Sequence, residues 1–246
     1  MEFELLAFGL ITGFTSGFFG IGGGSILIPM LLVAGFAMKE AVAISIMQMV
    51  FSSIYGSFLN SKKIKGLFRD GIILGVGASV GGLFSGYFLP SIPDIYLQYL
   101  FIAVLIYTIY TLFKAPASQE VIQADKNIFL LAFIGFCVGI FAMSIGIGGS
   151  LMLLPILVQF LKYDLKVATA LGLFFVIFSS IGGFISTSLY GNMLYYEGAI
   201  IGIGSLIGVY FGIKIKEKTK STSYKKFVLL LNLFVLATMI YKTVEF

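Results

Sequence analysis

The stretch Gly13-Phe14-Thr15-Ser16-Gly17-Phe18-Phe19-Gly20-Ile21-Gly22-Gly23-Gly24 decides the fold, and a second copy of its end, Gly146-Ile147-Gly148-Gly149-Ser150, follows 126 residues later. Adjacent glycines are poor helix formers, so each cluster predicts a break in the helix that contains it. The two clusters interrupt residues 3–37 and 128–161, which are otherwise largely apolar. We therefore expect two broken helices at corresponding places in the chain.

The composition predicts that these breaks lie in a lipid bilayer. The chain has 246 residues, 59% of them apolar and 11% charged, and its mean hydropathy is +1.06. Soluble domains are typically about 45–50% apolar and about 25% charged, so the composition excludes a soluble enzyme, a nucleic-acid binder and a disordered scaffold. The chain has no His and one Cys, Cys137, which excludes zinc sites, disulfide frameworks and His-based catalysis. We expect an all-α integral membrane protein with no catalytic residue, no metal and no cofactor.

Six apolar runs approach the length of about 20 residues that a helix needs to cross the hydrocarbon core. They are residues 41–59, 71–89, 95–113, 167–189, 198–213 and 227–241. The arms that follow the glycine clusters, about 25–37 and 150–161, would be helices only about 18–20 Å long, too short to cross about 30 Å. We favour re-entrant hairpins there, and hairpins of two full spans are the alternative.

The positive charges predict the orientation of the spans. Of the 16 Lys and Arg residues, 14 fall in four loops, at 60–70, 114–127, 162–166 and 214–226. Cytoplasmic loops are enriched in Lys and Arg. We therefore expect these four loops inside and both termini outside, in a multi-pass protein of the cell membrane.

The two halves of the chain repeat each other. Beyond the glycine clusters the offset becomes 127, so that Phe51-Ser52-Ser53-Ile54 matches Phe178-Ser179-Ser180-Ile181. The basic 60–70 loop then corresponds to residues 190–197, which contain no Lys or Arg. Equivalent loops thus face opposite sides of the membrane, and we infer that the repeats are inverted.

This inversion predicts the organisation of the chain. Each repeat must cross the membrane an odd number of times, so each comprises a glycine-broken hairpin plus three transmembrane helices, about eight hydrophobic helices in all. The expected boundaries are a first repeat at 1–113, a cytoplasmic linker at 114–127 and a second, inverted repeat at 128–246.

Discontinuous helices at matching positions of two inverted halves are typical of a transporter site. Unpaired backbone N–H groups and the positive dipole end at the start of a half-helix can bind an anion without a charged side chain. Pro29 and Pro155 are expected near the start of each half-helix, where a missing N–H costs little. The candidate substrate-binding residues are the breaks and nearby hydroxyl and amide groups: Gly22, Gly23, Gly24, Ser25, Gly148, Gly149, Ser150, Gln48, Ser52, Ser53, Ser179 and Ser180.

Simpler interpretations stand beside these. Gly9, Gly13 and Gly17 fit a helix-packing stripe, and the serine hydroxyls can bond to the preceding turn of their own helix. The predicted mid-membrane segments contain no ionisable residue of the kind that proton relays use, so any coupling ion stays open. A secondary transporter for a small anion is the leading hypothesis. A passive anion channel, a non-transporting subunit of a membrane complex and an intramembrane enzyme are the alternatives.

These motifs resemble the signature of the TauE/SafE-type family of sulfite exporters and sulfonate permeases. The resemblance rests on residues 13–24 and on the second copy at 146–155, and it covers about residues 5–240. It implies an inner-membrane permease, not an enzyme, for small sulfur-containing anions such as sulfite, thiosulfate or organosulfonates. Ser150 departs from the pattern where the first copy has Gly24, which implies a narrower or more polar second site. The particular anion, the direction of transport and a homodimeric state are left open.

Overall fold

The computed structural model describes residues 2–20, 22–60, 68–114, 127–163, 165–191, 193–219 and 221–244. Within these residues the chain forms helices and no strand, which confirms the all-α prediction. The elements are α1 (Glu2–Phe19), α2 (Gly24–Val33), α3 (Met38–Asn60), α4 (Phe68–Phe88), the 3₁₀ turn η2 (Leu89–Ser91), α5 (Asp94–Lys114), α6 (Ile128–Ser144), α7 (Ser150–Pro155), the π-helical turn η3 (Ile156–Phe160), α8 (Leu165–Tyr190), α9 (Tyr195–Lys218) and α10 (Ser221–Val244).

Six of these helices are long and apolar enough to cross a membrane, and they coincide with the six predicted spans. They are α3, α4, α5, α8, α9 and α10. The apolar runs at 198–213 and 227–241 lie within α9 and α10, each of which has 24 residues, about 36 Å of helix. Their length comes from Lys and Tyr residues at the ends, whose apolar stems extend the span toward the interface.

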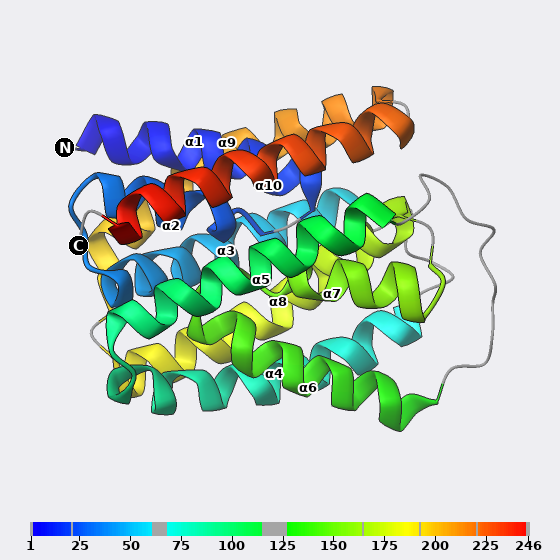
Figure 1. The fold of residues 1–246 in the computed structure, drawn as a ribbon, viewed down its shortest axis with the longest axis horizontal. Coiled ribbons are helices and arrows are strands. Elements are labelled where there is room, and N and C mark those ends of the chain that lie inside the picture. The colour runs from blue at the N-terminus through cyan, green and yellow to red at the C-terminus, as the bar shows by residue number, and fades with distance from the viewer. Residues whose placement is uncertain are drawn as a thin grey trace.

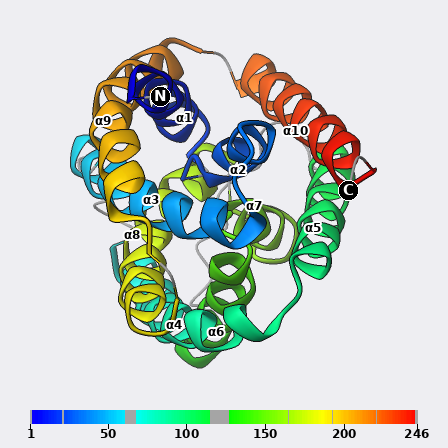
Figure 2. The same cartoon turned by 90° about the vertical axis from the view of Figure 1, so that its left-hand side faces the viewer.

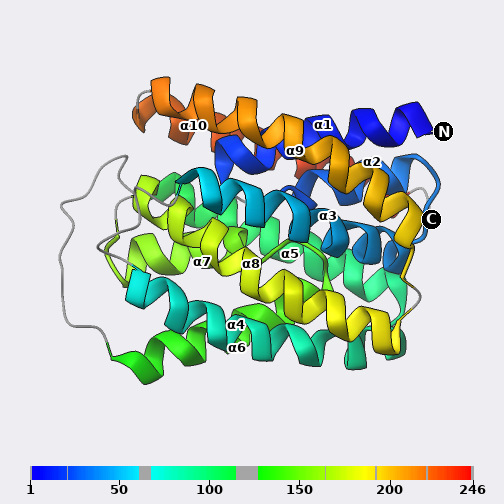
Figure 3. The same ribbon diagram turned by 180° about the vertical axis from the view of Figure 1, so that it is seen from behind.

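The helices run side by side along the long axis of the molecule, and both chain termini lie at the same end (Figure 1). From that end α1 runs inward and α2 turns back, whereas α6 and α7 make the same turn from the opposite end (Figures 1 and 3). Seen end-on, α2 and α7 lie in the middle of the molecule with the longer helices around them (Figure 2). With 10 residues, α2 is about 15 Å long, which is half of the hydrocarbon thickness.

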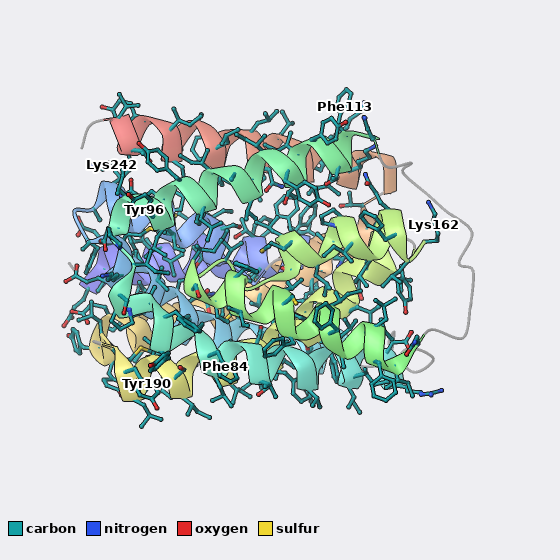
Figure 4. The ribbon with its side chains drawn as sticks, turned by 60° about the horizontal axis from the view of Figure 1, so that its bottom comes forward. Phe84, Tyr96, Phe113, Lys162, Tyr190 and Lys242 are labelled. Carbon is teal, nitrogen blue, oxygen red and sulfur yellow. The ribbon has the colours of Figure 1, made fainter. Side chains whose placement is uncertain are left out.

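The outer surface of the helix bundle is apolar, as a lipid-facing surface must be. Large side chains such as Phe3 and Phe129, each 84% exposed, point away from the protein. Figure 4 places Tyr96, Tyr190 and Lys242 at one end of the molecule and Lys162 at the other. The helix ends that precede the predicted cytoplasmic loops meet at the Lys162 end, opposite the termini. The side of the membrane that each end faces remains a prediction from the charge count.

Three helix pairs are packed through glycine at backbone distance: α1 with α9, α4 with α6, and α4 with α8. A Cβ atom added to Gly13 of α1 would lie 2.6 Å from the Cα of Ser205 on α9, far inside the distance that real Cβ atoms keep. Glycines along α4 and α6 approach each other's backbones in the same way, for example Gly139 at Ala78. These contacts confirm the packing interpretation of the Gly9, Gly13 and Gly17 stripe.

The order of elements is the same in the two predicted repeats. One broken hairpin and three long helices form α1 to α5, and the same series forms α6 to α10. Most of the predicted linker, at 115–126, and most of the 60–70 loop, at 61–67, lie outside the described residues. The inverted relationship and the domain boundaries therefore stay predictions from the sequence.

Candidate functional site

Both glycine clusters form helix breaks with the same backbone conformation. Gly20, Gly22 and Gly23 have φ values of 71°, 81° and 82°, and Gly146, Gly148 and Gly149 have 66°, 82° and 76°. Side chains other than glycine rarely adopt this left-handed region, which explains why these positions hold glycine. Each half-helix follows directly on its last left-handed glycine, and neither Gly23 nor Gly149 provides a side-chain cap. The first N–H groups of a helix lack intrahelical acceptors, so both breaks present backbone donors.

The two breaks meet in the interior of the protein. A Cβ atom added to Gly24 would collide with the carbonyl oxygen of Gly146 and would lie 2.5 Å from the Oγ of Ser45. The Ser45 hydroxyl donates a hydrogen bond to the Gly146 carbonyl oxygen at 2.7 Å. The tips of the two hairpins are therefore in direct contact, and a side chain of α3 ties them together.

Buried polar side chains without a partner among the described residues lie on the helices that meet here, α2, α3 and α7. The amide nitrogen and oxygen of Gln48 both lie 3.1 Å from the position of a Cβ atom on Gly23. Neither of these atoms has a hydrogen-bond partner in the described part of the chain, and the same holds for the buried hydroxyls of Ser25, Ser53 and Ser150. Gln48 is 0% exposed and Ser25 is 1% exposed. Because unsatisfied buried polar groups are costly and few in native proteins, this group of donors indicates a place for a polar ligand.

Three other predicted serines have hydrogen-bond partners in the structure. Ser179 donates to the carbonyl oxygen of Val176, and Ser180 donates to that of Ile177. Both bonds go to the preceding turn of the same helix, as the simpler interpretation held for this pair. The hydroxyl of Ser52 lies 3.4 Å from the Gly22 carbonyl oxygen, so it contacts the first break.

The two breaks are lined differently, although the sequence offset relates them. Gln48 on α3 corresponds to Phe175 on α8 at the offset of 127. Gln48 contacts the first break at Gly23, and the ring of Phe175 stands against the second break at Gly149. A polar wall thus faces α2 and an aromatic wall faces α7.

A second pair of corresponding positions also differs between the two halves. At the first break, Ser45 of α3 contacts Gly24. At the second break, the corresponding residue of α8 is Gly172, and a Cβ atom added to it would lie 3.0 Å from the Cβ of Ser150. In each half one position holds serine and its neighbour holds glycine, but the order is reversed. This explains how Ser150 is accommodated where the first copy has Gly24.

The two prolines do not occupy the expected first turn. Pro29 and Pro155 are each the sixth residue of their helix, because α2 begins at Gly24 and α7 at Ser150. The prediction of their place was therefore wrong. A proline at this position leaves the carbonyl oxygen four residues earlier without its helical donor. In α7 that carbonyl belongs to Leu151, and the Thr108 hydroxyl of α5 donates to it at 3.2 Å. The chain then continues as the π-helical turn η3.

Sequence reasoning missed Ser45, Phe175 and Thr108. Ser45 lies three residues before Gln48 on α3, which is the spacing of neighbours on one helix face, so its position could have been found. Phe175 could have been found by applying the repeat offset to Gln48. No signal in the sequence indicated that Thr108 of α5 would bond to α7.

A cavity of about 320 Å³ opens near the end of the molecule that carries the termini. Its lining includes Lys39 and Ala43 of α3 and Thr187 and Tyr190 of α8. Ala43 lies two residues before Ser45, about 3 Å along the helix axis. The cavity therefore ends close to the level of the breaks.

Comparison with known proteins gives the same answer as the glycine motifs. The family model described as sulfite exporter TauE/SafE matches residues 5–239. The probable membrane transporter protein MJ0441 of Methanocaldococcus jannaschii is 29% identical over 242 residues, which cover 89% of this chain and 90% of that protein. The probable membrane transporter proteins YdhB and YunE of Bacillus subtilis are 25% and 23% identical, over 83% and 87% of this chain and 86% and 90% of their own lengths. The chain belongs to the sulfite exporter TauE/SafE family of membrane transport proteins.

Proposed function

We propose that this protein is a secondary transporter that carries small sulfur-containing anions such as sulfite, thiosulfate or organosulfonates. The observation that carries the proposal is the meeting of the two helix breaks within a group of buried, unpartnered polar side chains. The family supports a transporter, and the chemistry of these groups supports an anion as its substrate.

The first break is the stronger half of the proposed site. Gly22, Gly23, Gly24 and Ser25 form the start of α2, where backbone N–H groups and the positive end of the helix dipole favour a negative charge. The amide of Gln48 stands beside them and can donate to an oxyanion. Ser53 adds an unpartnered buried hydroxyl on the same helix as Gln48.

The second break contributes fewer polar groups to the proposed site. Gly148, Gly149 and Ser150 begin a helix of six residues, and Phe175 takes the place that Gln48 has in the first half. Ser150 is fully buried and its hydroxyl has no partner among the described residues. We assign it to the site because Gly172 joins it to the first break. A Cβ atom added to Gly172 would lie 3.0 Å from the Cβ of Ser150 and 3.3 Å from the carbonyl oxygen of Gly20.

Purified protein in liposomes, assayed with labelled sulfite, thiosulfate and an organosulfonate, tests the proposal. We expect saturable uptake of at least one of these anions, accelerated by the unlabelled anion on the other side. Flux that neither saturates nor responds to the opposite side would indicate a passive channel. The absence of flux and of binding for all three anions would contradict the proposal.

Variants of the breaks test the location of the site. Gly23→Leu and Gly149→Leu should abolish uptake, because both positions have left-handed backbone and closely packed neighbours. Gly56→Ala is the matched control, since its Cβ would meet only side-chain atoms at 3.5 Å or more. Normal uptake by both Leu variants would contradict this location of the site.

A further inference from the structure

The polar groups around the first break are all neutral. They are the amide of Gln48, the hydroxyls of Ser25, Ser45 and Ser52, and backbone N–H and carbonyl groups. The buried hydroxyls of Ser53 on α3 and Ser150 on α7 are neutral as well. Among the described side chains that are polar and buried, Lys216 is the one that carries a charge, and it belongs to the last turn of α9. A bound anion would therefore be held by dipoles, without a counter-charge.

The titratable side chains on the surrounding helices are all partly or fully exposed. Where the side chains are described, they are Glu2 and Glu4 on α1, Lys39, Glu40 and Tyr55 on α3, Asp94, Tyr96, Tyr99, Tyr107, Tyr110 and Lys114 on α5, Cys137 on α6, Tyr190 on α8, and Lys225, Lys226, Tyr241 and Lys242 on α10. Neither α2 nor α7 has any. The helices that pack around the break therefore place no described buried acid or base beside it.

This arrangement discriminates between anions by their charge. The cost of transferring an ion from water to a medium of low dielectric constant grows with the square of its charge, so it is about four times larger for a dianion. The attraction of fixed dipoles grows only in proportion to the charge, so it is about twice as large. For a dianion the extra desolvation cost exceeds the extra attraction, and no cation is present among the groups named above to offset it. The singly charged form is therefore favoured.

The amide of Gln48 adds a chemical reason. Its nitrogen can only donate and its oxygen can only accept, and both atoms are buried without a partner in the described residues. A hydrogen-bearing oxyanion offers acceptors and one donor, so it can satisfy both atoms of the amide. A dianion offers acceptors alone, and would leave the amide oxygen unpaired.

We propose, on the basis of the function proposed above, that the site carries monovalent anions and takes a titratable oxyanion in its hydrogen-bearing form. For sulfite the transported species is then hydrogen sulfite. After crossing, hydrogen sulfite ionises to sulfite and a proton, so each ion that ionises moves one proton across the membrane. Transport is thereby linked to pH although no side chain of the site titrates.

The test compares three anions in proteoliposomes as a function of pH. Sulfite, whose second ionisation lies near neutral pH, is the titratable probe. Methanesulfonate is monovalent and sulfate is divalent throughout the range. Above the second ionisation, the initial rate at fixed total sulfite should fall about tenfold per pH unit. The methanesulfonate rate should stay constant, the sulfate rate should stay far lower, and sulfite uptake should acidify the vesicle interior.

Other outcomes separate this inference from the proposed function. A sulfite rate that is flat or rises with pH, a sulfate rate equal to that of methanesulfonate, or a methanesulfonate rate that falls in parallel would overturn the monovalent preference alone. No transport of any anion would overturn the proposed function as well. Protein-free vesicles correct for passive entry of sulfur dioxide.

Two variants of Gln48 sharpen the test. Gln48→Lys places a cation beside Gly23, and we expect it to flatten the fall of sulfite transport with pH and to raise sulfate transport. Gln48→Met keeps the size of the side chain but removes its donor and acceptor. It should lower sulfite transport while the rate still falls with pH, because the difference in desolvation cost remains. If Gln48→Lys does not fold, the wild-type pH profile still decides the question.

Discussion

Substitution of Gly24 by alanine tests whether contact between the two hairpin tips holds the site together. The added Cβ would lie 2.5 Å from the Ser45 Oγ and closer still to the carbonyl oxygen of Gly146, whereas real Cβ atoms essentially never come nearer than 3.0 Å to another heavy atom. The tips must therefore separate by more than about half an ångström. The hydrogen bond from Ser45 to Gly146, now 2.7 Å, would be stretched or broken.

The expected cost can be estimated from these two effects. Overpacking of a well-packed interior costs about 1–3 kcal/mol, and a lost hydrogen bond adds about 1 kcal/mol. The sum of about 2–4 kcal/mol corresponds to a decrease in Tm of roughly 5–15 °C for a chain of this size. Because the donors of the site lie at the displaced tip, we expect initial uptake to fall by at least about tenfold.

The assay combines thermal unfolding of the purified protein in detergent with uptake into liposomes. Gly56→Ala on α3 is the control, because its Cβ would lie 3.5 Å from the nearest atom, a side-chain carbon of Val209. Alanine favours a helix interior over glycine by about 1 kcal/mol, so this variant should have an unchanged or higher Tm and normal uptake. Wild-type Tm and uptake in Gly24→Ala would refute the reasoning, since the tips could then not be in contact.

Three further substitutions address the packing around the site. Ser45→Ala should lower the free energy of unfolding by about 1 kcal/mol, because the buried Gly146 carbonyl oxygen loses its donor; an unchanged Tm would show that this bond contributes nothing. Burial, and then the hydrogen bond to Asp70, raise the pKa of Tyr163 above its ordinary value of about 10. The folded state thus retains this proton longer than the unfolded state, and its stability should decrease above about pH 10, more in the wild type than in Tyr163→Phe, as measured by Tm against pH. Gly13→Val should prevent stable assembly of α1 on α9, because a side chain there meets backbone, and a wild-type amount of folded protein in the membrane would contradict this.

The helix breaks could be predicted because they depend on local chemistry. Three adjacent glycines disfavour a helix in any context, and the structure assigns left-handed backbone to Gly22 and Gly23 and to their counterparts 126 residues later. The six long helices could be predicted for the same reason, because a run of apolar residues long enough to span the membrane is visible in the local sequence alone. Short second arms also follow from the count of residues.

The contacts across the site could not be predicted in the same way. The bond from Ser45 to Gly146 joins residues 101 positions apart, and nothing in either local sequence specifies the other. The start of α2 was expected at about residue 25 and lies at Gly24, which makes Pro29 the sixth residue of the helix; the error was to count this position as part of the first turn. The donation from Thr108 to α7 depends on how α5 lies on the hairpin, which is a matter of tertiary packing.

The glycine-packed helix pairs constrain how the protein can change shape. Helix α1 belongs to the first predicted repeat and packs on α9 of the second, and α4 likewise packs on α6 and α8. Rocking of one repeat as a rigid body against the other is a common mechanism of transporters, but here it would pull these backbones apart.

We expect the helices that move during transport to be those outside these interlocked pairs. Helix α10 contacts α2 and α5, and α5 contacts α7, so the four are connected, with α5 and α10 on one side of the molecule and α2 and α7 in its interior (Figure 2). We expect that a crosslink between α1 and α9 leaves transport intact, and that one between α2 and α10 arrests it. The two repeats would then reflect a duplication in the ancestry of the sequence, whereas the helices that move together during transport would come from both repeats.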